Sequence, residues 1–239
     1  MLRVAINGLG RIGKSFLRSI LQDKDALQKM QVVAINIGPA KIEYLAYFFT
    51  YDTTMGKYHG DVRLVGDQLI IDGHHIKILT ESDPTKLPWK SLNIDWVVEC
   101  TGHFTHREGA SKHLQAGAKH VLISAPANNP DVTIVPGVNH HLYDEKKDAI
   151  VSLGSCTTNA VTPMLKVMHD AFTIEHAMMT TIHAYTNTQV LLDVQGEDER
   201  RSRAAALNII PTTTGAMKVV TQILPELAGR IEGLALRVQ

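Results

Sequence analysis

The fold is decided by the stretch Leu2-Arg3-Val4-Ala5-Ile6-Asn7-Gly8-Leu9-Gly10-Arg11-Ile12-Gly13. It begins as a short apolar strand and runs directly into a Gly-x-Gly-x-x-Gly turn. Apolar residues then recur at helical spacing to about Gln22, and the β-branched run Gln31–Ile35 predicts a second strand. Strand, helix and strand in this order predict a βαβ unit with parallel pairing.

The three glycines of this turn indicate dinucleotide binding. Gly8 permits the sharp turn, Gly10 lets a pyrophosphate approach the backbone, and Gly13 lets the helix pack closely on the strand. The free N–H groups at the start of the helix then hold the anion. A tight turn with no ligand is the alternative, but the strand before it and the helix after it favour a nucleotide site.

The remaining pattern predicts two domains. Residues 1–153 alternate between strands and helices, with meander strands near 62–79, and predict a Rossmann-type doubly wound α/β domain. We expect a helix over 41–50 within it. Residues 154–239 predict a second, α+β catalytic domain that is incomplete at its carboxyl end, because few strands are available to pair with the final run Gly233–Val238.

Composition excludes several classes of protein. The 239 residues carry 24 basic and 24 acidic side chains and are 44% hydrophobic, which argues against disorder and against nucleic acid or an anionic membrane as the main partner. No apolar run is long enough to cross a bilayer, and no signal peptide precedes the first strand, so we expect a cytoplasmic protein. Two cysteines are too few for a disulfide scaffold. No metal site is expected, because no acid or cysteine stands at ligand spacing beside the paired histidines.

One expected residue of the nucleotide site is missing. An acidic residue after the second strand usually accepts hydrogen bonds from the adenosine ribose. Here Asn36-Ile37-Gly38-Pro39-Ala40-Lys41 contains none. One interpretation is that NADP is accepted, with Lys41 favouring its phosphate. The other, which we favour, is that Asn36 and backbone groups hold the ribose of NAD.

Cys156 is the candidate nucleophile. It lies in Gly154-Ser155-Cys156-Thr157-Thr158-Asn159, between a predicted strand and a predicted helix, where the helix dipole and free N–H groups favour a thiolate. Cys100 lies in an apolar run and fits a small buried side chain instead. His183 ends a predicted strand and is a reasonable base, although spacing alone does not place it beside Cys156.

Together these segments resemble the phosphorylating glyceraldehyde-3-phosphate dehydrogenase family, and the resemblance spans essentially the whole chain. Five segments carry it: Ala5–Gly13, Ser155–Asn159, His183–Asn187, Arg200–Ala206 and Pro211–Ala216. The resemblance implies that Cys156 attacks glyceraldehyde 3-phosphate, that His183 activates the thiol and relays a proton, and that inorganic phosphate cleaves a thioester to give 1,3-bisphosphoglycerate.

The resemblance also assigns the binding residues. To Gly8, Gly10, Gly13 and Asn36, which the residues themselves indicate, it adds these cofactor-binding residues: Asn7, Arg11, Ile12, Thr101 and Ser124. It implies that these residues bind the phosphate of the substrate or the attacking phosphate: Ser155, Thr157, Thr186, Thr214, Gly215 and Arg237. The loop from Thr186 to Ala204 is similar to the loop that lies between subunits of the family's homotetramer.

Three departures from the family leave alternatives open. Ile37 replaces the usual ribose-binding Asp, and Ser82 stands where an Arg is common. The family's chains also continue beyond Gln239, so we expect a fragment of a longer product. Oxidation of erythrose 4-phosphate uses the same motifs, and an inactive cofactor-binding paralogue would keep the same scaffold. The sequence does not fix the direction of the reaction, glycolytic or gluconeogenic.

Overall fold

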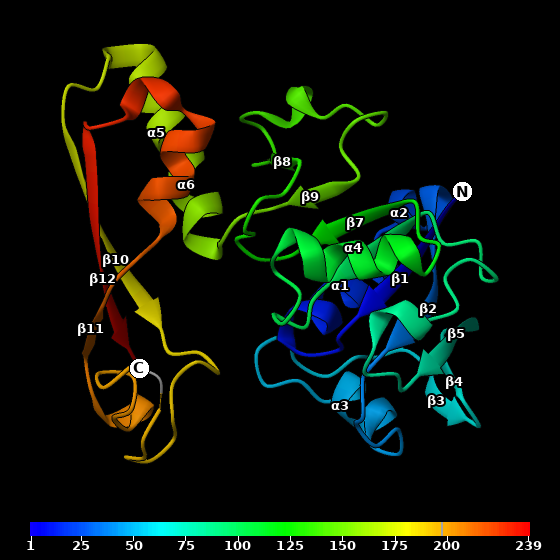
Figure 1. Cartoon of the computed structure of the whole chain (residues 1–239). Coiled ribbons are helices and arrows are strands. Elements are labelled where there is room, and N and C mark those ends of the chain that lie inside the picture. Colours follow the sequence, from blue (N-terminus) through cyan, green and yellow to red (C-terminus); the bar gives the residue numbers. More distant parts are fainter. Residues whose placement is uncertain (197) are drawn as a thin grey trace. The chain divides into compact units, whose positions relative to one another are not determined.

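A computed structural model describes residues 1–196 and 198–239 and shows two compact units (Figure 1). The first contains residues 1–133 and 142–153, and the second contains residues 134–141 and 154–239. A large parallel sheet in the first unit and a separate sheet in the second confirm the predicted class, a doubly wound α/β fold with a second α+β part. The functional division into domains 1–153 and 154–239 stays a prediction.

The first unit is built on one sheet, which has nine strands within the described residues, in the order β3-β4-β5-β2-β1-β6-β7-β9-β8. The strands are β1 (Leu2–Asn7), β2 (Met30–Asn36), β3 (Val62–Val65), β4 (Gln68–Ile71), β5 (His74–Leu79), β6 (Trp96–Glu99), β7 (His120–Ile123), β8 (Val132–Thr133) and β9 (Ile150–Ser152). In this order, every neighbouring pair from β5–β2 through to β9–β8 is parallel. Strands β3, β4 and β5 form the antiparallel meander that the sequence predicts. The βαβ prediction is therefore confirmed.

Apolar side chains cover both faces of this sheet. Successive residues of a strand point to opposite faces, so Ala5 and Ile6 of β1 enter different clusters. The helices of this unit are α1 (Arg11–Gln22), α2 (Lys24–Lys29), α3 (Leu45–Thr50) and α4 (Arg107–Gln115). Ile6 packs with Leu17 of α1. Ala110 of α4 packs on strands β7 and β9, and α4 lies in front of the sheet in Figure 1.

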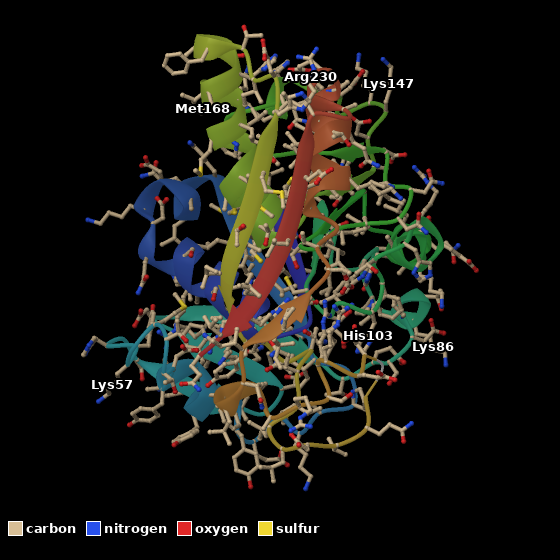
Figure 2. The ribbon with its side chains drawn as sticks, turned by 90° about the vertical axis from the view of Figure 1, so that its left-hand side faces the viewer. Lys57, Lys86, His103, Lys147, Met168 and Arg230 are labelled. Carbon is tan, nitrogen blue, oxygen red and sulfur yellow. The ribbon has the colours of Figure 1, made fainter. Side chains whose placement is uncertain are left out.

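The sheet of the second unit has the strand order β10-β12-β11. Strands β10 (Ala177–Ala184) and β12 (Ile231–Val238) are parallel, and β11 (Ile210–Thr212) is antiparallel to β12. Helices α5 (Cys156–Phe172) and α6 (Ala216–Ile223) pack through an apolar cluster centred on Val161 and Val220. Figure 2 views β10 and β12 side by side. The alternate residues of β10 are exposed, so one face of this strand carries uncovered apolar side chains such as Met178 and Ile182.

Some predicted elements differ in the structure. The expected helix over 41–50 forms only over α3, because a bend and a turn occupy the residues just before Leu45. Short 3-10 turns occupy Pro84–Lys86, His140–Leu142, Ala205–Leu207 and Pro225–Leu227. In the described part of the chain, no helix combines the length and the apolar character that a membrane crossing requires.

Candidate active site

The glycine turn leaves room for a ligand at one position only. Gly8 takes a φ of 96°, and a Cβ added there would lie 2.9 Å from backbone atoms of Cys100 and Thr101. A Cβ at Gly13 would lie 2.1 Å from the carbonyl oxygen of Gly8, so α1 packs directly on the turn. At Gly10 no atom lies within 4 Å of an added Cβ, and no side chain caps the start of α1. Free N–H groups beside open space suit the pyrophosphate of a dinucleotide.

A pocket of about 540 Å³ opens at the carboxyl ends of β1, β2 and β6. Its walls include five of the predicted cofactor residues: Asn7, Gly8, Gly10, Asn36 and Thr101. The other four predicted cofactor residues are not among those lining it: Arg11, Ile12, Gly13 and Ser124. The position agrees with the rule that doubly wound sheets bind ligands beyond the carboxyl ends of their strands.

Two of the residues outside the pocket wall have internal partners. The guanidinium of Arg11 lies 2.6 Å from the Asp52 carboxylate, which also accepts from Lys14 at 3.1 Å. The hydroxyl of Ser124 donates to the carbonyl oxygen of Glu99 at 2.9 Å. The side chains of Arg11 and Ser124 are thus occupied within the protein, and a role for either in binding the cofactor stays a prediction.

Below the pocket a buried carboxylate, Glu99, organises the wall. It accepts hydrogen bonds from Asn7 Nδ2 at 2.6 Å, from His113 Nε2 at 3.1 Å, and from both the N–H and the hydroxyl of Thr101. Burial raises the pKa of Glu99, but these hydrogen bonds outweigh it and hold the pKa below its usual range. Glu99 thereby fixes two of the predicted cofactor residues in place.

The tautomer of His113 follows from its two partners. The indole N–H of Trp89 donates to His113 Nδ1 at 3.1 Å, and an indole nitrogen only donates. Nδ1 therefore accepts, and we assign the proton to Nε2, which faces Glu99. Both side chains of the Trp89–His113 pair are fully buried.

In the second unit, Cys156 begins α5 and is exposed. Gly154 takes a φ of 66° just before it, and Ser155 caps the helix by accepting from the Thr158 N–H at 3.0 Å. This turn presents the sulfur at the helix start, where N–H groups and the dipole face outward. Cys100 differs, because burial raises the pKa of its thiol to about 11.

His183 lies beside Cys156. Its Nε2 is 3.1 Å from Cys156 Sγ, although 27 residues separate them in the chain. Its Nδ1 lies 2.6 Å from the carbonyl oxygen of Ala184, which can only accept, so Nδ1 carries a proton. In the neutral ring, Nε2 then turns a lone pair toward the sulfur. The arrangement can take the thiol proton.

A cationic cluster adjoins this pair. Arg237 is the register partner of His183 in the β10–β12 ladder, and its Nη1 donates to Thr186 Oγ1 at 2.9 Å. Arg201, from the loop before β11, donates to Thr212 Oγ1 at 2.8 Å. Burial and the charge of Arg201 lower the pKa of Arg237, while the charge of Cys156 acts in the opposite direction. Guanidinium and hydroxyl groups in this arrangement suit a phosphate.

The remaining predicted phosphate residues lie at two helix starts. Ser155 and Thr157 are at the beginning of α5 and are half-buried. Thr214 Oγ1 accepts from the N–H of Ala216 at 3.2 Å, and Gly215 begins α6 without a side-chain cap. All of them lie at positions where N–H groups face outward, as anion binding requires.

Sequence reasoning missed Arg201 and the Glu99–His113 pair as site residues. It also missed Glu81, which lines the pocket two residues after the end of β5. Arg201 lay in a charged run, Glu197–Arg203, whose spacing gives no sign of a contact with Thr212; Glu197 itself lies outside the described residues. In the sequence, Glu99 is a single polar residue at the end of an apolar strand, a pattern that by itself does not indicate a functional role. A signal was present there, because a buried carboxylate needs partners at the same edge of the sheet. Within the described ranges, no group of three or more metal-ligating side chains comes together.

The dinucleotide-binding fold and the cysteine–histidine pair define a dinucleotide-dependent oxidoreductase. Comparison with known proteins shows the family to which it belongs. The family model described as "Glyceraldehyde 3-phosphate dehydrogenase, NAD binding domain" matches residues 2–107, and that described as its "C-terminal domain" matches residues 155–239. The chain belongs to the glyceraldehyde-3-phosphate dehydrogenase family, and NAD is its cofactor.

Several curated relatives support this membership. A glyceraldehyde-3-phosphate dehydrogenase of Geobacillus stearothermophilus is 48% identical over 236 residues, which are 99% of this chain and 69% of the relative. One of Kitasatospora aureofaciens is 48% identical and covers 100% of this chain and 70% of the relative. A chloroplastic form of Scenedesmus vacuolatus is 48% identical, with 97% and 73% coverage. The chain therefore spans about 70% of the length of these relatives.

Proposed function

We propose that this oxidoreductase oxidises glyceraldehyde 3-phosphate to 1,3-bisphosphoglycerate, with NAD as oxidant and inorganic phosphate as second substrate. The observation that carries the proposal is the 3.1 Å approach of Cys156 Sγ to His183 Nε2 at the start of α5. A scaffold that only bound the cofactor would need no thiol paired with an imidazole. The neighbouring contact of Arg237 with Thr186 supplies a place for a phosphorylated substrate.

The chemistry follows from the pair. His183 Nε2 takes the thiol proton, and the thiolate attacks the aldehyde carbon to form a carbon–sulfur bond. The backbone N–H of Cys156, at the helix start, stabilises the oxyanion, and His183 returns its proton to give a thiohemiacetal. NAD, when bound, supplies the acceptor for the hydride that leaves this carbon. As the hydride leaves, His183 takes the hydroxyl proton again, and a thioester remains.

Two phosphate groups must then be held. We assign the phosphate of the substrate to Arg237 and Thr186. We assign the attacking phosphate to the helix starts formed by Ser155, Thr157, Thr214 and Gly215. A phosphate oxygen attacks the thioester carbonyl, the carbon–sulfur bond breaks, and Cys156 leaves as a thiolate with an acyl phosphate as product.

We also propose that the protein assembles as a homotetramer and works in the cytoplasm. The loop from Thr186 to Ala204 exposes Leu191 by 82% and Leu192 by 74%, and such side chains are usually covered by another chain. The exposed thiol of Cys156 suits a reducing compartment, where thiols are kept from oxidation.

Thiol labelling tests the proposed nucleophile directly. With iodoacetamide at neutral pH, Cys156 is expected to react at least about tenfold faster than Cys100, because the thiol of Cys100 is buried and its pKa is about 11. His183→Asn is expected to slow the labelling of Cys156 and leave that of Cys100 unchanged. Equal rates at the two cysteines would refute the assignment.

Turnover then tests the substrates. NAD reduction is expected to require glyceraldehyde 3-phosphate and inorganic phosphate together, and Cys156→Ser is expected to abolish it. A higher kcat/KM for erythrose 4-phosphate would identify the alternative dehydrogenase. Cofactor binding without any phosphate-dependent reduction would identify an inactive relative.

A further inference from the structure

The pocket contains a carboxylate that sequence position alone does not reveal. We propose that Glu81 recognises the adenosine ribose of the cofactor and disfavours a 2′-phosphate, so that it supplies the discrimination between NAD and NADP that Ile37 cannot. The inference rests on the dinucleotide occupying the pocket described above. In doubly wound folds the ribose lies beside the loop that follows the second strand, and Ile37, Gly38, Pro39 and Ala40 of that loop line this pocket.

Strand pairing brings Glu81 to this loop. Strand β5 is the parallel neighbour of β2, with Leu79 opposite Asn36, so both strands end at the same edge of the sheet. The N–H of Ile37 donates to the carbonyl oxygen of Leu79 at 2.9 Å, which continues the ladder past the end of β2. Glu81 follows two residues later and lines the pocket.

A buried amide fixes the backbone of Glu81. Asn36 Nδ2 donates to the Glu81 carbonyl oxygen at 2.9 Å, and the Glu81 N–H donates back to Asn36 Oδ1 at 2.9 Å. Asn36 Nδ2 also donates to Asn7 Oδ1 at 2.7 Å. Since Asn36 is only 3% exposed and its amide is engaged on both sides, its contribution is to position Glu81 rather than to contact the ribose.

The Glu81 side chain is held in place through one of its two carboxylate oxygens. Its Oε1 accepts from the Asp83 N–H at 2.9 Å, which anchors a half-buried carboxylate. Among the described residues no group donates to its second oxygen, which is therefore available to a ligand hydroxyl. A carboxylate fixed in this way accepts hydrogen bonds from a ribose diol and repels a phosphate at the same place.

The charges around the pocket favour the same result. Of the residues that line the pocket in the described part of the chain, Glu81 is the one carboxylate, and neither Lys nor Arg is present among them. Ser82, next to it, adds no cation. Lys41 follows the lining residue Ala40 but is exposed, so solvent screens its attraction for a phosphate more than it screens the half-buried Glu81.

Binding of three ligands to the 239-residue chain tests the inference. Titration calorimetry with NAD, 2′-deoxy-NAD and NADP is applied to the wild type, to Glu81→Gln and to Asp83→Asn as the matched control. Asp83→Asn keeps the N–H that Glu81 accepts and removes a carboxylate that caps Thr85 outside the pocket. A lost hydrogen bond to a charged group and a lost repulsion are each expected to change Kd by about tenfold.

We expect the wild type to prefer NAD. In Glu81→Gln, NAD is expected to bind about tenfold more weakly and NADP about tenfold more tightly. The wild type is expected to lose about tenfold in affinity when the 2′-hydroxyl is removed, and Glu81→Gln to lose less than threefold. Asp83→Asn is expected to leave all three constants within about twofold of the wild type.

Four results would overturn the inference. Equal weakening of all three ligands in Glu81→Gln would indicate a structural role only. Affinities that Glu81→Gln leaves unchanged would indicate that Glu81 does not contact the ligands. If the wild type prefers NADP and Lys41→Gln reverses that preference, Lys41 is the residue that discriminates between the cofactors. Failure of the wild type to bind NAD at all would refute the proposed function as well, which separates the two failures.

Discussion

Replacing Glu99 by Gln is the sharpest test of the buried network below the cofactor pocket. The carboxylate accepts from Asn7 and His113 through Oε2 and from Thr101 through Oε1. A glutamine has the same shape but turns one oxygen into an NH₂ group. Whichever way the amide is placed, that group faces an N–H donor, because Thr101 N–H cannot accept and His113 Nε2 carries the proton.

The tautomer of His113 makes this cost unavoidable. If His113 moved its proton to Nδ1, Nε2 could accept from the new amide, but Nδ1 would then face the indole N–H of Trp89 at 3.1 Å. With the NH₂ at the Oε1 position, the Thr101 N–H loses its acceptor while the Thr101 hydroxyl can rotate to accept. At least one hydrogen bond to a buried charge is therefore lost, worth about 1.5–3 kcal/mol. The hydrogen bonds that remain are no longer made to a charged oxygen, so we expect Glu99→Gln to lower the free energy of unfolding by about 2–4 kcal/mol.

Urea unfolding followed by circular dichroism measures this change. In a Trp89→Phe background the histidine can change tautomer, so Glu99→Gln is expected to cost at least about 1 kcal/mol less than in the wild type. The pKa of Glu99 lies below its usual range, so its stabilising effect is present above that range and is lost as the pH falls. Glu99→Gln is therefore expected to reduce the loss of stability on acidification. A cost under about 1 kcal/mol in the wild-type background would refute the hydrogen-bond assignment.

Four further substitutions separate folding from function. Gly13→Ala, whose new Cβ would lie 2.1 Å from a backbone oxygen, is expected to lower the free energy of unfolding in urea by about 2–3 kcal/mol, whereas Gly10→Ala should fold normally and bind NAD at least about tenfold more weakly by calorimetry. Asp52 has its pKa held below the usual range, chiefly by the N–H of Met55, so its stabilising effect is lost as the pH falls; Asp52→Asn is expected to flatten the pH dependence of unfolding below about pH 5. Arg237→Lys loses the directed contact with a hydroxyl and is expected to raise KM for glyceraldehyde 3-phosphate about tenfold in steady-state assays.

Much of the fold could be predicted because local signals agreed with it. The glycine turn, the β-branched second strand and the meander turns all carry their own conformational preferences. Asp72 and Gly73, for example, both take a positive φ, as the turn between β4 and β5 requires. Helix α2 was not predicted, because it has only 6 residues. Its main sequence signal is a single residue, Asp23, whose side chain accepts hydrogen bonds from the N–H groups of Asp25 and Ala26.

The site was predictable in its residue types but not in its contacts. The position of Cys156 at a helix start follows from local sequence, whereas its approach to His183 depends on where α5 begins relative to the end of β10. Glu81 gave no local signal, because its place beside Ile37 comes from the pairing of β5 with β2, strands that are far apart in the chain. Register between distant strands is a tertiary property, which single-sequence patterns do not contain.

The amide of Asn36 has a practical consequence for protein engineering. It joins Asn7, at the end of one strand, to the main chain of Glu81, at the end of another, without using the side chains at positions 37 and 81. Those two positions can be randomised together in a library while the hydrogen bonds of the Asn36 amide stay intact. Coenzyme choice in this scaffold should then be adjustable independently of its architecture.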